Sequence, residues 1–222
     1  MVRALRARGI ETVAHVRPDS PRLVEWRRRF EALGARVDAS PWDGRVLTQT
    51  LSLVRPDLIF ALLGTTASRA RRARATTGAD EGYDAVDYGL TMLLYHAAVL
   101  SGCRPRFVYL SAIGVRESGG NAYLRARARV ERELREGSLP WTVARPSFIT
   151  GPDRDEPRPA ERIAAEIADG ALALAGMLGA RRRRDRYRST TNVVLADALV
   201  RLALDPAMAG KVVESEDLRA GA

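Results

Sequence analysis

The chain has 222 residues and a formal net charge of +9, from 36 Lys and Arg against 27 Asp and Glu. Hydrophobic residues make up 46% and charged residues 28%, a composition that predicts a folded domain and excludes the disordered class. A single cysteine, Cys103, excludes an internal disulfide, and with only two histidines there is no metal-ligand spacing, so we expect no metal site.

The apolar runs of the chain are much shorter than the roughly 18 residues that a membrane span requires. We therefore expect no membrane partner and, since no charged-then-apolar leader opens the chain, a cytoplasmic location. Lys211 is the only lysine, so the positive charge is nearly all arginine. This indicates a general preference for arginine over lysine and not a binding surface, so we expect nucleic acid to be an unlikely partner. Only the basic run at 180–188 favours nucleic-acid binding.

Apolar strand-like runs alternate with longer helical segments along most of the chain. This alternation predicts an α/β fold with a doubly wound parallel sheet and helices on both of its faces. Strands are predicted at 12–18, 35–43, 58–64, 106–114, 141–152 and 211–215. Helices are predicted at 2–8, 22–34, 46–56, 83–102, 119–137, 159–176 and from about 195 onward.

The amino-acid composition changes after Pro152, where the chain becomes rich in Arg, Asp and Pro before an alanine-rich segment. We expect one domain, with 1–152 as the core. Residues 153–222 are expected to add a small substrate-side lobe and then the closing helix and strand of the same domain.

Four short motifs occur in a fixed order: "LLGTT" at 62–66, "YLSAIG" at 109–114, a Tyr-x-x-x-Arg pair at 123–127, and "ARPSFITGP" at 144–152. In this order they resemble the atypical short-chain dehydrogenase/reductases over nearly the whole chain. The match is nearest to the subgroup of NmrA-like and Tat-interacting-protein-like oxidoreductases. The resemblance implies a Rossmann-like, NAD(P)-binding fold.

Tyr123 and Arg127 are four residues apart on a predicted helix, so both can face one ligand. The resemblance implies that Tyr123 gives a proton to a substrate carbonyl and that Arg127 replaces a lysine that holds the cofactor ribose. Lowering the pKa of a phenol by about 3 units, towards neutrality, requires about 4 kcal/mol. A cation about 4 Å away stabilises the phenolate by a similar free energy. The alternative is that Tyr123 is a helix-start aromatic and Arg127 a solvated side chain.

Ser111 ends a predicted strand and, by the resemblance, would hydrogen-bond the substrate carbonyl. The family often has two serines here, and this chain continues with Ala112. The alternative role for Ser111 is that of a satisfied loop serine.

The resemblance also assigns cofactor contacts to residues at strand ends. Leu63, Gly64 and Thr65 would pass beside the adenosine ribose, and Pro146 and Ser147 beside the nicotinamide amide. Each stretch could equally be a simple strand-to-loop turn.

Arg17 follows the predicted strand 12–18 at the place where an acidic side chain selects NAD. An arginine there suits the 2′-phosphate, which makes NADP the preferred cofactor and leaves NAD possible. Asp43 resembles an adenine-side aspartate, although a turn-capping role fits as well.

The sequence has no glycine-rich turn that would bring a pyrophosphate to a helix N-terminus. Its opening, "MVRALRARG", resembles the second half of the helix that follows such a turn. The resemblance therefore implies that a strand is missing between those at 12–18 and 58–64. A start assigned too far downstream explains this; a truncated gene product or a strand from another chain are alternatives.

The expected function is NADPH-dependent reduction of small carbonyl or quinone-like molecules. The alternative is a non-catalytic NAD(P)-sensing or protein-interaction module of the same fold, favoured by the arginine at 127 and the single serine. The long helix at 84–101 could form the face of a homodimer.

Overall fold

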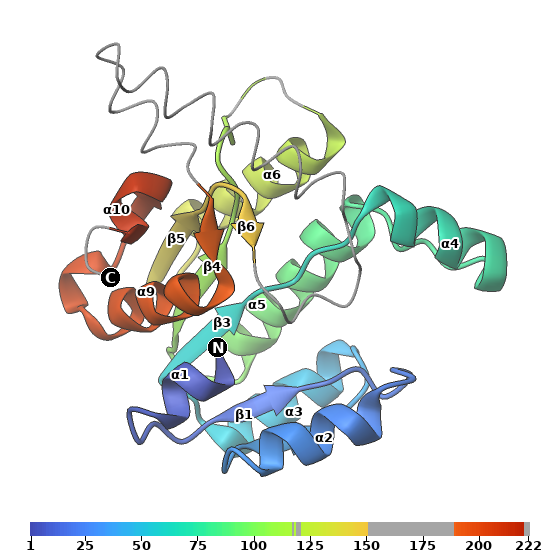
Figure 1. The fold of residues 1–222 in the computed structure, drawn as a ribbon, viewed down its shortest axis with the longest axis horizontal. Coiled ribbons are helices and arrows are strands. Elements are labelled where there is room, and N and C mark those ends of the chain that lie inside the picture. The colour runs from blue at the N-terminus through green and yellow to red at the C-terminus, as the bar shows by residue number, and fades with distance from the viewer. Residues whose placement is uncertain (117, 119–120, 151–188, 220–222) are drawn as a thin grey trace.

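The computed structural model describes residues 1–116, 118, 121–150 and 189–219. Its centre is a four-stranded parallel sheet in the order β3-β4-β5-β8 (Figure 1). These strands are β3 (Leu58–Ala61), β4 (Arg106–Leu110), β5 (Trp141–Arg145) and β8 (Lys211–Glu214). The doubly wound α/β fold predicted from the sequence is confirmed.

Two further strands, β1 (Val13–His15) and β2 (Arg36–Asp38), form a separate parallel pair. No backbone ladder joins this pair to the four-stranded sheet among the residues described. β1 and β3 are therefore both edge strands.

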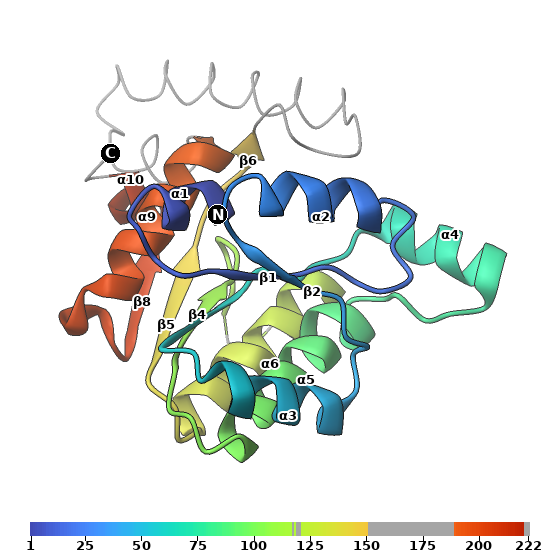
Figure 2. The same ribbon diagram turned by 90° about the horizontal axis from the view of Figure 1, so that it is seen from below.

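Helices cover the four-stranded sheet on both faces (Figure 2). One face carries α3 (Gly44–Val54), α5 (Thr91–Leu100) and α6 (Ala122–Glu136); the other carries α1 (Val2–Arg6), α9 (Asn192–Leu204) and α10 (Ser215–Arg219). The other helices of the described residues are α2 (Leu23–Glu31), α4 (Ala67–Thr77), the π-helical η1 (Asp84–Leu90) and the short 3₁₀ turn η2 (Pro206–Met208).

The central strand β4 shows why the sheet is buried on both faces. Phe107 and Tyr109 join the apolar cluster under α5 and α6, whereas Val108 joins the cluster under α9, and all three are fully buried. Side chains alternate between the faces of a strand, so a near-continuous apolar run is the mark of a covered parallel sheet. Each such side chain contributes about 1.5–3 kcal/mol on burial.

Several elements differ from the sequence predictions. The segment predicted as one helix at 83–102 begins with a π-helical stretch, η1 (Asp84–Leu90), before α5. The strand predicted at 141–152 is interrupted after Arg145 because Pro146 has no N–H for the ladder, and a short strand β6 (Ile149–Thr150) then pairs with β7 (Thr190–Thr191).

The helix expected from about 195 starts at Asn192, because Thr191 caps it by accepting a hydrogen bond from the Val194 N–H. The helix α4 was not predicted. The alanine-rich helix expected at 159–176 and the basic run at 180–188 lie outside the described residues. Within the part of the chain described, no helix combines the length and apolar character needed to cross a bilayer.

Candidate active site

The carboxyl ends of β3, β4 and β5 lie on one rim of the sheet. The ladder aligns Ala61 with Tyr109 and Tyr109 with Val143, so the residues that follow each strand emerge together. Three of the sequence motifs therefore meet at this rim, where open parallel sheets bind their ligands.

Tyr123 lies in the first turn of α6, which begins where Asn121 accepts a hydrogen bond from the Leu124 N–H at 3.0 Å. The guanidinium carbon of Arg127 is 4.7 Å from the centre of the Tyr123 ring. Arg127 is only 5% exposed, so the alternative of a solvated arginine is wrong. The two side chains converge, as their spacing predicted.

Arg127 is held by groups from several elements. Its Nη2 is 2.8 Å from Oδ1 of Asp87, a fully buried carboxylate on η1. The same guanidinium donates to the carbonyl oxygens of Leu63 and Leu110, at the ends of β3 and β4. Arg127 thereby ties the Tyr123 helix to the rim.

The loop after β3 closes over this arginine. The Thr65 N–H donates to Oδ2 of Asp87 at 3.0 Å. A Cβ added at Gly64 would lie 3.0 Å from Nη2 of Arg127, which is closer than ordinary contact. The absence of a side chain at Gly64 lets the "LLGTT" loop lie against the guanidinium without displacing it.

Burial raises the pKa of the Tyr123 phenol above its usual value, and Arg127 opposes this shift without cancelling it. The direction is opposite to the one expected from the sequence, because desolvation of the phenolate outweighs one nearby cation. Burial likewise raises the pKa of Asp87, again against the influence of Arg127. Tyr123 is therefore protonated at neutral pH, which is the form that donates a proton.

Three buried polar atoms around Arg127 have no hydrogen-bond partner among the described residues: Thr65 Oγ1, Tyr109 Oη and Arg127 Nε. Buried polar groups are nearly always paired, so three unpaired atoms in one cluster set this part of the core apart. The rim thus brings together a glycine, a protonated phenol and polar atoms that have no partner among the described residues.

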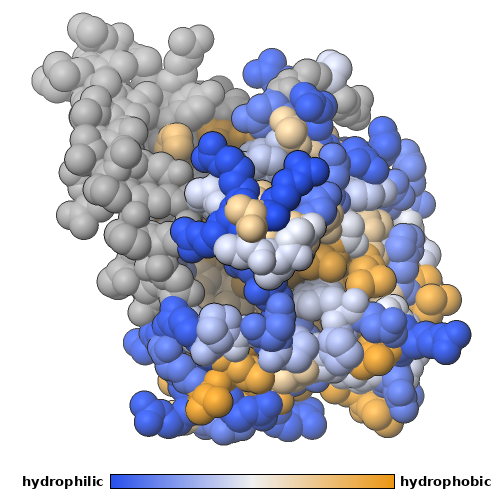
Figure 3. All heavy atoms as spheres, turned by 90° about the vertical axis from the view of Figure 1, so that its right-hand side faces the viewer, coloured by the Kyte–Doolittle hydropathy of each residue, from blue (hydrophilic) through white to orange (hydrophobic). Residues whose placement is uncertain are grey.

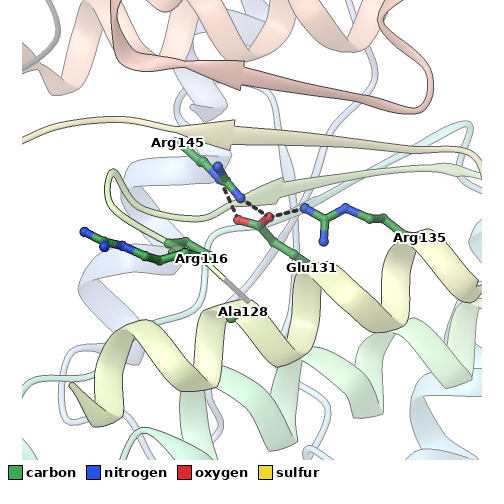
Figure 4. A pocket seen from close by; sticks show the side chains of 6 residues that line it. Arg116, Ala128, Glu131, Arg135 and Arg145 are labelled. Carbon is green, nitrogen blue, oxygen red and sulfur yellow. Dashed lines mark hydrogen bonds and ion pairs between the residues drawn. The ribbon is translucent and has the colours of Figure 1, made fainter. Parts of the chain in front are cut away.

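Ser111 belongs to a second cluster, centred on Glu131 of α6. Its hydroxyl donates to Oε1 of Glu131 at 2.6 Å, and Glu131 is fully buried. Arg145 donates to both oxygens of Glu131, at 2.9 and 2.6 Å, and Arg135 donates at 2.7 Å (Figure 4). The hydroxyl of Ser111 is thus directed to a carboxylate of the protein.

A cavity of about 290 Å³ lies beside Glu131 and does not include Tyr123 or Arg127. Its lining comprises Val115, Arg116, Ala128, Glu131, Arg135 and Arg145. In Figure 4, Arg116 points away from the carboxylate that the other two arginines share.

The remaining predicted residues lie outside the Tyr123 cluster. Arg17 pairs with Glu81 at 2.9 Å and with Asp19 at 3.4 Å. Asp43 accepts from the N–H groups of Arg45 and Val46 and caps α3, so its capping role is confirmed.

Pro146 and Ser147 follow β5 on the rim. The Pro146 carbonyl accepts from the Ile113 N–H at 2.9 Å, and the Ser147 N–H donates to the Ser215 hydroxyl at 3.2 Å. Both residues thereby fasten the rim to neighbouring loops.

The sequence predictions missed Asp87, Glu131 and Arg145. A signal was present on α6, where Ala126, Val130 and Leu134 form its buried stripe. Arg127 and Glu131 follow directly after two of these positions, so they border the apolar face, where a charged side chain needs a partner.

No family model matches the chain. Among curated proteins, the mitochondrial protein fmp52 of Emericella nidulans is 31% identical over 137 residues, or 61% of this chain and 53% of that protein. The fmp52 protein of Aspergillus niger is 28% identical over 57% of this chain and 49% of that protein. The chain spans about half the length of the curated relatives it matches. Their mitochondrial names contradict the cytoplasmic location expected from the sequence.

Solved structures show the same fold. An oxidoreductase of the short-chain dehydrogenase/reductase family from Burkholderia thailandensis aligns over 100% of this chain and 87% of its own, with a TM-score of 0.64 and 19% identity. A putative NAD-dependent epimerase/dehydratase from Bacillus halodurans aligns over 100% and 92%, with a TM-score of 0.60 and 16% identity. The chain therefore has the Rossmann-like fold of these dehydrogenases and epimerases.

Proposed function

We propose that the chain is an NADP-linked oxidoreductase that reduces small carbonyl or quinone-like molecules, of the NmrA-like kind suggested by its motifs. The observation that carries this proposal is the meeting of Tyr123 and Arg127 at the rim formed by β3 and β4. The free polar atoms of Thr65 and Tyr109 beside them support a polar ligand there. NAD remains the second choice of cofactor.

In this proposal each side chain has a defined task. Tyr123 Oη holds the proton that is delivered to the substrate oxygen, and its raised pKa keeps that proton in place at neutral pH. Arg127 stabilises the phenolate that remains, and Asp87 fixes the guanidinium. A dinucleotide held at this rim would supply the hydride.

Ser111 has a supporting task in this scheme. Its hydroxyl donates to Glu131, so it orders the loop after β4. Anchoring a substrate carbonyl would require that bond to open.

The second candidate is a non-catalytic NAD(P)-responsive module. One observation favours it: the charged and hydroxyl groups that catalysis would use already pair with acids of the protein. Arg127 pairs with Asp87, Ser111 with Glu131 and Arg17 with Glu81.

We also propose a further strand between β1 and β3. These two edge strands belong to separate sheets, and a strand that paired with both would join the sheets into one. Such a strand and its glycine-rich turn would supply the pyrophosphate contacts. In a chain extended upstream by these elements, NADPH is expected to raise the melting temperature more than it does in this chain. Equal increases in the two chains would contradict the proposed strand.

The test is NADPH oxidation against a panel of quinones and aldehydes. Tyr123→Phe is expected to lower turnover by about 100-fold or more. Tyr83→Phe is the matched control, since the Tyr83 ring lies 5.4 Å from the Tyr123 ring at the same site. Unchanged turnover in Tyr123→Phe would refute the catalytic role, and NADPH binding without turnover on any substrate would favour the responsive module.

A further inference from the structure

One carboxylate links two arginines from distant parts of the chain. Glu81 Oε1 is 2.9 Å from Nη1 of Arg17, and Glu81 Oε2 is 2.7 Å from Nε of Arg69. Arg17 follows β1, and Arg69 lies in the first turn of α4, which follows β3. The two guanidinium groups thus come from the segments that follow two different strands, β1 and β3.

The helix that carries Arg69 is strongly basic and exposed. α4 contains Arg69, Arg71, Arg72 and Arg74, has no acidic residue and buries none of its side chains. It projects from the body in Figures 1 and 2. Viewed from the α4 side, Figure 3 shows strongly hydrophilic side chains standing out over this region. Such a surface attracts anions towards the Arg17–Arg69 pair.

The contacts to Glu81 have the geometry of an anion site. Two guanidinium groups share the two oxygens of one carboxylate, an arrangement that a phosphate monoester can reproduce with its own oxygens. The side chains of Arg17, Arg69 and Glu81 are 36%, 45% and 20% exposed, so a ligand from solution can reach them. The hydrogen bond from Arg69, supported by Arg17, lowers the pKa of Glu81, which therefore stays charged at neutral pH.

We propose that Arg17 and Arg69 together form a binding site for a phosphate monoester, and that the Glu81 carboxylate is a built-in competitor for the same two guanidinium groups. The proposal rests on the proposed function in one respect: the phosphate is taken to be the 2′-phosphate of NADP. Arg17 and Arg69 would then together select NADP over NAD, and competition from Glu81 would set the affinity for the 2′-phosphate.

The first experiment measures binding of inorganic phosphate by calorimetry. Glu81→Gln is expected to bind phosphate about 10-fold more tightly than the unaltered chain. Adding Arg69→Gln to that variant should abolish the gain, whereas Arg71→Gln, an exposed arginine of the same helix, should preserve it. Equal phosphate affinity in the unaltered chain and in Glu81→Gln overturns the inference.

The second experiment compares adenosine 2′,5′-bisphosphate with 5′-AMP on the same variants. Glu81→Gln should tighten the bisphosphate about 10-fold and leave 5′-AMP unchanged. An equal gain for both nucleotides would show that the two arginines bind a phosphate other than the 2′-phosphate, so the assignment of this site to NADP would be overturned. If the variants bind phosphate as expected but neither nucleotide, the anion site stands and the proposed function fails.

Discussion

Arg127 and Glu131 lie one turn apart on α6, and each belongs to a buried arginine–carboxylate site. At the Glu131 site both carboxylate oxygens accept hydrogen bonds, from Ser111, Arg135 and Arg145. At the Asp87–Arg127 site the ion pair is next to a protonated phenol, and nearby polar atoms of Thr65 and Tyr109 have no partner among the described residues. The first site is therefore saturated with hydrogen bonds, whereas the second is the one to which the proposed function assigns a ligand.

The largest effect on stability is expected at Glu131. Glu131→Gln leaves Arg145 and Ser111 with a weaker acceptor and removes the charge that the half-buried arginines share. Breaking a buried ion pair costs about 3–5 kcal/mol, so urea unfolding should show a loss of that order. Glu136→Gln, at an exposed position on the same helix, should change the free energy of unfolding by less than about 0.5 kcal/mol. Equal effects would contradict a structural role for Glu131.

Arg127→Leu should cost less, about 1–3 kcal/mol at pH 8, because Asp87 can take up a proton when its partner is lost. Burial already raises the pKa of Asp87, and removing Arg127 raises it further. The stability that this carboxyl contributes is present below its ordinary pKa of 3.8 and is lost as pH rises through the raised value. The deficit of Arg127→Leu should therefore be smaller at pH 5 than at pH 8; a deficit independent of pH would refute this explanation.

Gly64→Ala tests the loop that closes over Arg127. The added Cβ would lie 3.0 Å from Nη2, so the guanidinium must shift by a few tenths of an ångström. Thermal unfolding should report a loss of about 1 kcal/mol. Gly44→Ala is the control, because its Cβ would meet only Leu93 at 3.4 Å, at the start of α3, where alanine favours the helix. A loss as large at Gly44 would contradict a specific close approach at Gly64.

The smallest effect is expected at Glu81, a partly exposed acid. Its lowered pKa means that its contribution to stability is present above the ordinary value of 4.5 and is lost as pH falls through the lowered value. Glu81→Gln should lower the free energy of unfolding by a few tenths of a kcal/mol at pH 7, about as much as a surface ion pair contributes. The difference should shrink as pH falls below 4.5, and a difference that does not change with pH would contradict this assignment.

Much of the fold could be predicted because the apolar pattern follows the two faces of the sheet. Phe107, Val108 and Tyr109 form a run that only a covered parallel strand explains. By contrast, the only apolar residues of α4 are alanines and no large apolar side chain marks a face, so periodicity gave no sign of it. The helix begins after the Thr66 cap and ends at Gly78, at φ +71°.

The site could be predicted only in part. The spacing of Tyr123 and Arg127 correctly placed both side chains together, because residues four apart share a helix face. The direction of the phenol pKa was wrong, since it depends on burial, which no local pattern reveals. Asp87 was missed because its partner Arg127 lies 40 residues further along the chain. Glu131 was missed because its burial depends on Ser111 and Arg145, which come from two strand ends and not from its own helix.

The most direct test measures turnover and unfolding together in Tyr123→Phe and Glu131→Gln. Tyr123→Phe should lose about 100-fold or more of NADPH turnover and keep its free energy of unfolding within about 1 kcal/mol. Glu131→Gln should unfold far more easily, yet retain turnover within a few-fold below its melting temperature. The reverse pattern, with turnover lost at Glu131 and kept at Tyr123, would contradict the assignment of chemistry to the Asp87–Arg127 site.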